Sequence, residues 1–155
     1  MTYRVRVRWW LTLGAVLAAA SLAATAHGGS SATATLRLDG VSFRPELALT
    51  AAQQQRGLMF RKRAREDGML FVFAVPTRGG FWMKNTLVPL KIVFFDTRGR
   101  AVRRFLMKPC RRDPCHIYDP GKQYRFALEL PATDTRAART LGPQAALRAL
   151  VARAG

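Results

Sequence analysis

Short segments in which hydrophobic and polar residues alternate, or in which β-branched and aromatic residues are dense, recur along the chain. Such segments predict β-strands. The predicted strands cover residues 33–38, 41–49, 68–73, 92–95, 101–106 and 125–130. Turn-forming residues separate them, for example at Asp39-Gly40 and over residues 96–100. The pattern therefore predicts a mainly β fold, either a β-sandwich, including jelly-roll-like forms, or a barrel.

Helical patterns are few and short, so we expect one or two short α-helices within a single domain. Thr50 and Gln53 form a capping box that predicts a helix over residues 51–56, and Gly57 ends it. Pro45 predicts an edge or a break in the second strand segment. The other segments with helical pattern or propensity are residues 133–141 and 144–154. The expected loops are residues 76–80 and 108–122.

The N-terminus has the three parts of a secretory signal peptide. Residues 1–10 carry three arginines and no acid, residues 11–24 form an apolar run, and Ala24-Thr25-Ala26 places small residues before a cleavage point. The run of 14 residues is shorter than the roughly 20 that span a membrane. We predict a signal peptide over residues 1–26, with an uncleaved anchor as the alternative.

After removal of the signal peptide, we expect the remaining chain to have two parts. We expect a flexible lead-in of Gly, Ser, Ala and Thr over residues 27–34 and a single β-rich domain over residues 35–155. After cleavage we expect no membrane span and a periplasmic or secreted location.

The charge balance bears on partners rather than on the fold. The 155 residues include 26 Lys and Arg against 9 Asp and Glu, for a formal net charge of +17. Hydrophobic residues make up 49% of the chain, enough to form a core. The basic residues are scattered and the aromatic residues lie mostly inside apolar segments, so we expect no specific nucleic-acid binding. An anionic envelope polymer is a candidate partner.

Cys110 and Cys115 lie in a predicted loop, with Pro114 among the residues between them. In an oxidising compartment a disulfide between the two cysteines is the expected state. Two alternatives stay open, a cysteine nucleophile beside His116 and a metal site that both cysteines form with His116. We assign no metal, cofactor or catalytic residue.

Two acids lie within strand-like apolar segments, Glu46 and Glu129. Each is either on the exposed face of its strand or buried with a cation, and Arg56, Arg61 and Lys84 are the candidate cations. The sequence contains no Gly-rich phosphate loop, serine nucleophile elbow or His-Glu-x-x-His motif.

Five ordered motifs give the chain a resemblance to a known family. They are Arg56 to Arg61, Gly68 to Phe73, Phe81 to Thr86, Pro89 to Asp96 and Tyr124 to Pro131. In this order and spacing the chain resembles the exported bacterial family catalogued as domain of unknown function 192, over about residues 41–142. The loop from Pro109 to Cys115, together with Tyr118, resembles members of the same family. The resemblance implies a compact, sandwich-like single β-rich domain, and it supplies no activity.

The chain departs from the family pattern in two places. Lys91 stands where the family usually has Asp after Pro-Leu, so any role of that carboxylate is absent here. The family's tail usually ends in a short strand after a Gly-Asp turn, whereas residues 144–154 are helix-prone.

Charged, amide and indole side chains near the apolar strands form the candidate ligand site. They are Arg56, Arg61, Trp82, Lys84, Asn85, Thr86 and Glu129. Apolar walls with a few convergent polar groups are typical of small-molecule pockets, and Trp82 near Asn85 suits a sugar-like or cyclic ligand. The alternative is a buried structural network that ties loops to the sandwich.

Three functional hypotheses follow. The first is a non-enzymatic binding or accessory module of the cell envelope, with a small-molecule or glycan ligand. The second is a small envelope hydrolase that acts on a cell-wall or glycan substrate, against which the missing acid at Lys91 and the lack of a nucleophile count. The third is a basic structural protein that binds a partner. Two titratable groups in a cleft with Arg or Lys would indicate an enzyme, and an open aromatic pocket would indicate a binding module.

Overall fold

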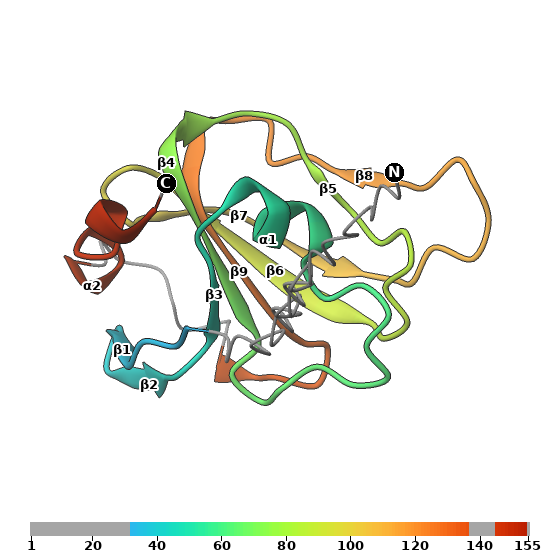
Figure 1. Cartoon of the computed structure of the whole chain (residues 1–155), viewed down its shortest axis with the longest axis horizontal. Helices are drawn as coiled ribbons and strands as arrows, with labels where there is room; N and C mark the ends of the chain where they lie inside the picture. The colour runs from blue at the N-terminus through green and yellow to red at the C-terminus, as the bar shows by residue number, and fades with distance from the viewer. Residues whose placement is uncertain (1–31, 137–144, 155) are drawn as a thin grey trace, which may run out of the picture.

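The fold is built on one five-stranded sheet with the strand order β3-β4-β9-β6-β7 (Figure 1). A computed structural model describes residues 32–136 and 145–154 of the chain. Strands β3 and β4 are parallel, and the other neighbours are antiparallel. The strands of this sheet are β3 Glu46–Ala48, β4 Met69–Thr77, β6 Leu90–Phe95, β7 Ala101–Met107 and β9 Tyr124–Pro131.

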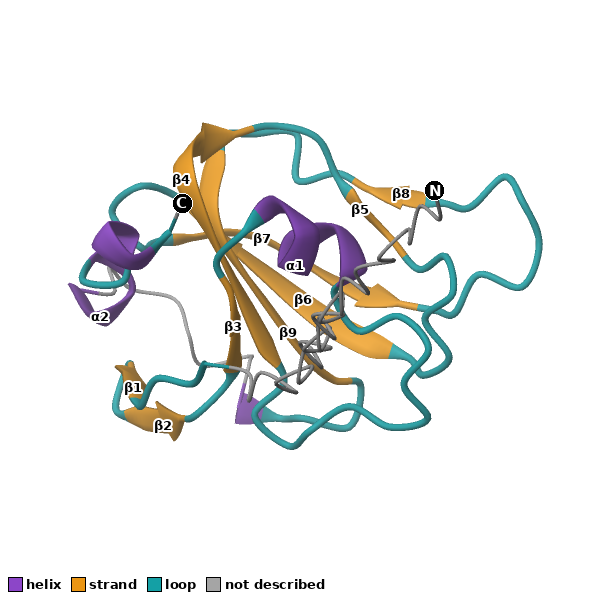
Figure 2. Ribbon diagram, in the orientation of Figure 1, coloured by secondary structure: helices purple, strands orange, loops and turns teal. Residues whose placement is uncertain are grey.

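Smaller elements cover both faces of this sheet. One face packs against the hairpin of β1 and β2 and against the C-terminal helical turns, and the other packs against α1 and the segments near it. Figure 2 shows α1 lying over the sheet, with the hairpin and α2 grouped at one end. These elements are β1 Leu36–Leu38, β2 Val41–Phe43, α1 Ala51–Arg56, β5 Phe81–Trp82, β8 Ile117–Tyr118, α2 Ala145–Arg148 and the 3₁₀ turn Val151–Arg153.

The mainly β, single-domain prediction is confirmed, and the period of two along the strands explains it. Alternate residues of each central strand enter different clusters, so that Leu70 and Leu128 face the hairpin side while Phe71 and Ala127 face the α1 side. Because both faces are covered, the central strands are apolar almost throughout.

The short helix begins and ends where the capping pattern predicts. The Thr50 hydroxyl accepts a hydrogen bond from the Gln53 amide N–H, and the Gln53 side chain accepts one from Thr50 N. The helix ends at Gly57, which has a φ of 45°. The Gln54 side chain donates to the Val72 carbonyl at 2.9 Å, which fixes α1 against β4.

Three expected boundaries differ from the structure. Strand β4 continues to Thr77, with an irregular register after Val72, so the loop begins later than predicted. The predicted cysteine loop contains the two-residue strand β8. Of the helix predicted over residues 133–141, residues 133–135 are not helical, Arg136 has 3₁₀ conformation and donates its backbone N–H to the Asp134 side chain, and the rest lies outside the described residues.

The ends of the domain are only partly described. The predicted signal peptide lies outside the described residues, as do residues 137–144 of the predicted C-terminal helices. Of the predicted lead-in, Ala32 accepts a hydrogen bond from Leu47 N at 2.8 Å, and Thr33 pairs with Glu46. The helix-prone tail forms α2 and the 3₁₀ turn, and Leu147 is buried in the core.

Gly68 lies too close to strand β9 to be replaced by a residue with a side chain without displacing the backbone. A Cβ at Gly68 would lie 1.7 Å from the Glu129 carbonyl oxygen, whereas Gly121, with a similar positive φ, has open space around it. We expect Gly68→Ala to lower the free energy of unfolding by about 4 kcal/mol and Gly121→Ala by about 1 kcal/mol. Urea unfolding of both variants measures this, and equal losses would contradict the close approach of residue 68 to β9.

Candidate functional site

A cavity of about 410 Å³ lies on the α1 side of the sheet. Its walls come from α1, the segment that follows α1, the end of β4, strand β5 and strand β9. The apolar part includes five aromatic residues, namely Phe71, Phe73, Phe81, Trp82 and Tyr124. The polar part includes Gln54, Gln55, Arg56, Arg78, Thr86 and Glu129. Apolar walls with a few polar groups are the composition expected of a small-molecule pocket.

Edge-to-face contacts hold the aromatic wall in place. Phe81 packs against Phe71 with ring centroids 4.9 Å apart and against Phe94 at 5.5 Å. Tyr124 contacts Phe94 at 4.8 Å and Phe73 at 5.5 Å. Since these pairs fix Phe81 in the core, they also fix the strand that carries the neighbouring Trp82.

Trp82 stands at the mouth of the cavity. Its side chain is 48% exposed, and Lys84 Nζ lies 5.7 Å from the centre of its ring. The same strand pairs Trp82 with Ile117 of β8. An indole that is partly exposed and whose backbone is fixed can contact a ring-shaped ligand with little loss of conformational entropy.

Glu129 supplies a carboxyl group on the floor of the cavity. The residue is 4% exposed, and no described residue donates a hydrogen bond to its side chain or forms an ion pair with it. Among the described residues, every side-chain oxygen that is fully enclosed has a hydrogen-bond partner. Because the Glu129 carboxyl has none, it is not fully enclosed, and it opens onto the cavity that it lines. Burial raises the pKa of Glu129 to about 8. At neutral pH the group is therefore mostly protonated and can donate a hydrogen bond.

Glu46 lies in register with Glu129 across the sheet, with Met69 between them, but its environment is different. Met69 pairs with Glu46 on one side and with Glu129 on the other, so both acids face the α1 side. Arg61 binds Glu46 through two hydrogen bonds of 2.5 and 2.9 Å. Hydrogen bonding to Glu46 raises the pKa of Arg61. Arg61 therefore neutralises a buried carboxylate and does not line the cavity.

The structure divides the predicted site residues into two groups. Arg56, Trp82, Thr86 and Glu129 line the cavity. Arg61, Lys84 and Asn85 do not line it. The structural-network alternative therefore describes part of the set, and the cavity contains the rest.

Lys84 and Asn85 organise the loop beside the cavity. Lys84 Nζ lies 2.9 Å from the Asp113 carboxylate. Asn85 has a φ of 57°, which asparagine tolerates better than most residues, and its carbonyl accepts a hydrogen bond from Phe60 N at 2.7 Å. These contacts place Thr86, which is buried, against the cavity.

The sequence interpretation missed several lining residues. Phe81 and Tyr124 belong to the motifs that carry the family resemblance, but neither is among the site residues that the sequence predicts. Their positions beside Trp82 and at the start of β9 were the available indication. Burial, with a smaller contribution from Asp119, raises the pKa of Tyr124 to about 12, so its hydroxyl stays protonated at neutral pH.

Cys110 and Cys115 form a disulfide in the structure, with their Cα atoms 5.6 Å apart. Within residues 32–136 and 145–154 no cysteine is free, so neither a thiolate nucleophile nor a thiolate metal site is present in this form. The Cys110 amide donates to the Met83 carbonyl at 3.2 Å, which joins the loop to the segment after β5. A disulfide is compatible with an oxidising, extracellular compartment.

Lys91 has a structural contact at the position of the missing acid. Its Nζ donates a hydrogen bond to the Asp134 carbonyl, which ties β6 to the segment after β9. In the part of the chain that the structure describes, no helix is long and apolar enough to cross a bilayer.

Glu129 makes stability depend on pH. Its pKa is raised from 4.5 to about 8, so the unfolded chain releases this proton at a lower pH than the folded domain does. Stability should therefore fall as the pH rises from about 5 to about 8. We expect Glu129→Gln to remove this loss, on the order of 3 kcal/mol over that range. Urea unfolding at several pH values measures it, and parallel pH profiles for both proteins would contradict the buried, unpaired carboxyl.

Comparison with known proteins places this domain. The family model for domain of unknown function 192, described as "Uncharacterized ACR", matches residues 34–143. No curated protein matches the chain. Among solved structures, a protein of Sinorhizobium meliloti 1021 described as a candidate transcription regulator has 29% identity and a TM-score of 0.61. The match covers 75% of this chain and 92% of that one.

A second solved structure has the same fold. It is a protein of unknown function from Novosphingobium aromaticivorans DSM 12444, with 25% identity and a TM-score of 0.61, and the match covers 76% of this chain and 91% of that one. Each matched chain therefore consists almost wholly of this domain. The chain belongs to the uncharacterised family known as domain of unknown function 192.

Proposed function

We propose that this domain is an exported, non-enzymatic binding module of the cell envelope, and that its cavity takes a small sugar-like ligand. The observation that carries the proposal is the Glu129 carboxyl, which opens onto an aromatic cavity without a partner among the described residues. A buried polar group without a partner is costly. A ligand that supplies a hydrogen-bond acceptor to this group would remove that cost.

The walls favour a ring-shaped ligand. Trp82, Phe73 and Phe81 offer aromatic surface, and Thr86 is among the polar lining residues. Rings with apolar faces and polar edges satisfy such a mixture, because the faces contact aromatic side chains while the edges form hydrogen bonds. Sugars and other small cyclic molecules have this character.

The cavity also contains a positive charge that favours an acidic ligand. Arg56 lines the cavity, and no described residue forms a hydrogen bond or ion pair with its side chain. An arginine binds carboxylate or phosphate groups through paired hydrogen bonds. A uronic acid combines the ring, the acceptor oxygens and the carboxylate, and it is a component of anionic envelope polymers. We therefore propose an acidic sugar as the ligand class.

A hydrolase is the second candidate, because a carboxyl with a raised pKa suits a general acid. Glycoside hydrolysis generally needs two carboxyl groups on either side of the bond. Glu129 is the only acid that lines the cavity among the described residues, and Arg61 engages Glu46. Binding is therefore the better-supported function.

We do not extend the description of the Sinorhizobium protein to this chain. In the present chain, most aromatic side chains of the described residues lie in the core and the cavity rather than along a basic face. Single-stranded nucleic-acid binding would need base-stacking aromatics in a basic groove.

Fluorescence tests the ligand directly. In a chain that begins at His27, Trp82 is the sole tryptophan, so its emission reports on the mouth of the cavity. We expect glucuronic acid to change this emission saturably at neutral pH. Glucose, which lacks the carboxylate, and glucosamine, which carries a positive charge, should bind at least about tenfold more weakly.

Matched variants separate the cavity from the adjacent loop. Arg56→Gln should remove the preference for the acidic sugar, because its guanidinium lines the cavity. Lys62→Gln, an exposed neighbour outside the cavity, should retain it. Thermal unfolding of both variants checks that they are folded. The absence of saturable binding by every sugar, or equal affinity for all three, would contradict the proposal.

A further inference from the structure

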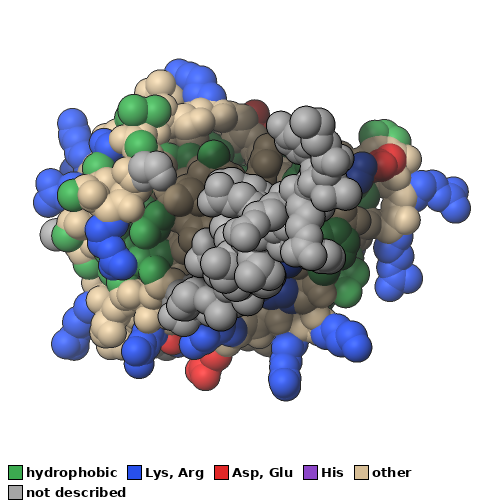
Figure 3. Space-filling model, in the orientation of Figure 1, with side chains coloured by type: hydrophobic (Ala, Val, Ile, Leu, Met, Phe, Trp, Pro, Cys, Tyr) green, Lys and Arg blue, Asp and Glu red, His purple; other side chains and the backbone are tan. Residues whose placement is uncertain are grey.

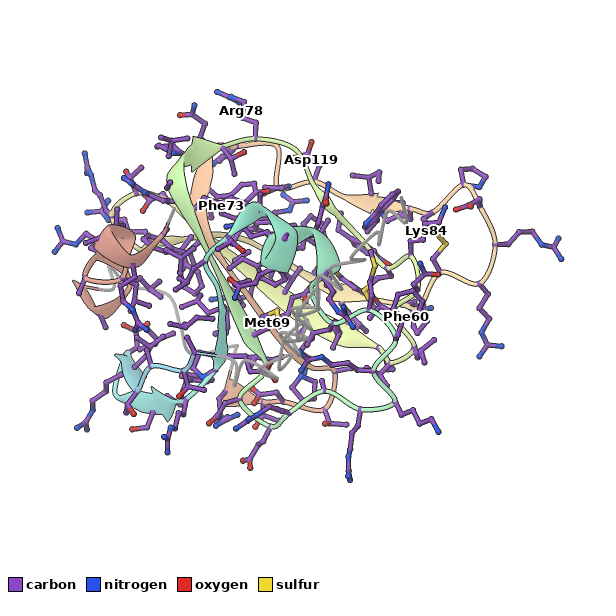
Figure 4. All side chains as sticks on the ribbon, in the orientation of Figure 1. Phe60, Met69, Phe73, Arg78, Lys84 and Asp119 are labelled. Carbon is purple, nitrogen blue, oxygen red and sulfur yellow. A yellow bond between two sulfur atoms is a disulfide. The ribbon has the colours of Figure 1, made fainter. Side chains whose placement is uncertain are left out.

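A second surface of the molecule surrounds the Lys84–Asn85 turn. Four large apolar side chains are exposed there, with exposed fractions of 64% for Phe60, 48% for Trp82, 56% for Leu87 and 49% for Ile117. Figure 4 shows Phe60 and Lys84 at the same end of the molecule. We call the four apolar residues, together with Lys84, Arg111 and Arg112, the Phe60 surface.

The backbone holds Phe60 in an unfavourable conformation. Its φ is 63°, which is uncommon for a bulky residue. The hydrogen bond from Phe60 N to the Asn85 carbonyl, at 2.7 Å, holds it there. Since the Phe60 ring is mostly exposed, burial of the ring does not offset the backbone strain. A contact outside the domain would account for an aromatic ring held in this position.

Strand pairing gives the same surface a second pair of apolar groups. Trp82 and Ile117 lie directly opposite each other on β5 and β8, so their side chains share one face of this small sheet. The other face carries Phe81 and Tyr118, which pack inward against Phe71 and Phe105. The outward face is apolar and exposed.

Positive charge surrounds these apolar groups. The backbones of Lys84 and Cys110 form an isolated parallel β-bridge. This pairing places the exposed Arg111 and Arg112 next to the turn. The adjacent acid, Asp113, is paired with Lys84. Figure 3 shows several basic side chains and one acidic patch at this end of the molecule.

We infer that the Phe60 surface docks on an anionic lipid bilayer, with Phe60 and Leu87 entering the headgroup region and the arginines contacting lipid phosphates. The apolar side chains come from two loops and from the small β5–β8 sheet, and cations lie among them, so they do not form one broad apolar face. Aromatic and leucine side chains flanked by basic residues suit the interface of an anionic membrane. Trp82 belongs to both this surface and the cavity, but Phe60, Leu87 and the arginines do not line the cavity, so variants of these residues test docking separately from the proposed sugar ligand.

Vesicle sedimentation of the chain from His27 tests the inference. We expect binding to vesicles of phosphatidylglycerol and phosphatidylcholine in equal parts, and about tenfold weaker binding by the double variant Phe60→Ser, Leu87→Ser. Leu106→Ser is the matched control, since Leu106 is 57% exposed and lies on β7, and it should bind like the wild type.

A second pair of variants tests the charge. Each basic residue near an anionic surface contributes about a fivefold factor, so Arg111→Ser with Arg112→Ser should weaken binding about 25-fold. The control, Arg98→Ser with Arg100→Ser, alters the exposed β6–β7 turn and should have little effect. Circular dichroism confirms the fold of each variant.

Three outcomes would overturn the inference. They are no binding to the anionic vesicles, equal binding by the Phe60 and Leu106 variants, and binding to an anionic polysaccharide but not to vesicles through the same residues. Because the sugar assay uses cavity residues, its failure is distinguishable from a failure of docking.

Discussion

Strand β9 lies between β4 and β6, and both of its faces are covered, so every side chain from Phe126 to Leu130 is buried. Four of these five residues are apolar and the fifth is Glu129. No cation among the described residues accompanies this acid, and its pKa rises to about 8. The energetic cost of a buried charge is avoided by holding the proton. A neutral hydrogen-bond donor on the floor of an aromatic cavity is the result.

The same row of the sheet shows the other solution to this problem. Glu46 is also buried, but the segment after α1 brings Arg61 to it. The same segment directs two arginines to different places. Arg61 reaches Glu46 on the edge strand β3, whereas Arg56 lines the cavity. The capping box, Gly57 and the Gln54 contact with β4 fix the position of α1, and so they determine this separation.

Local patterns predicted most of the fold, and long-range geometry decided the site. The capping box and the alternation of β9 depend on neighbours in sequence, so they could be predicted. Strand β8 has two residues within a loop, too few to show a period. Arg61 pairs with the buried Glu46 whereas Arg56 lines the cavity, and this difference depends on the sheet register and on the path of the segment after α1. The sequence predicted polar residues near apolar strands, and the structure placed four of seven in the cavity.

The central claim is that Glu129 is a protonated acid at neutral pH because its burial is not compensated by a cation. Carbon-13 NMR of the glutamate carboxyl groups tests it most directly, with the resonance of Glu129 assigned by its loss in Glu129→Gln. Our account predicts a chemical-shift transition with a midpoint near pH 8. A midpoint near 4.5, the ordinary value for glutamate, would contradict it.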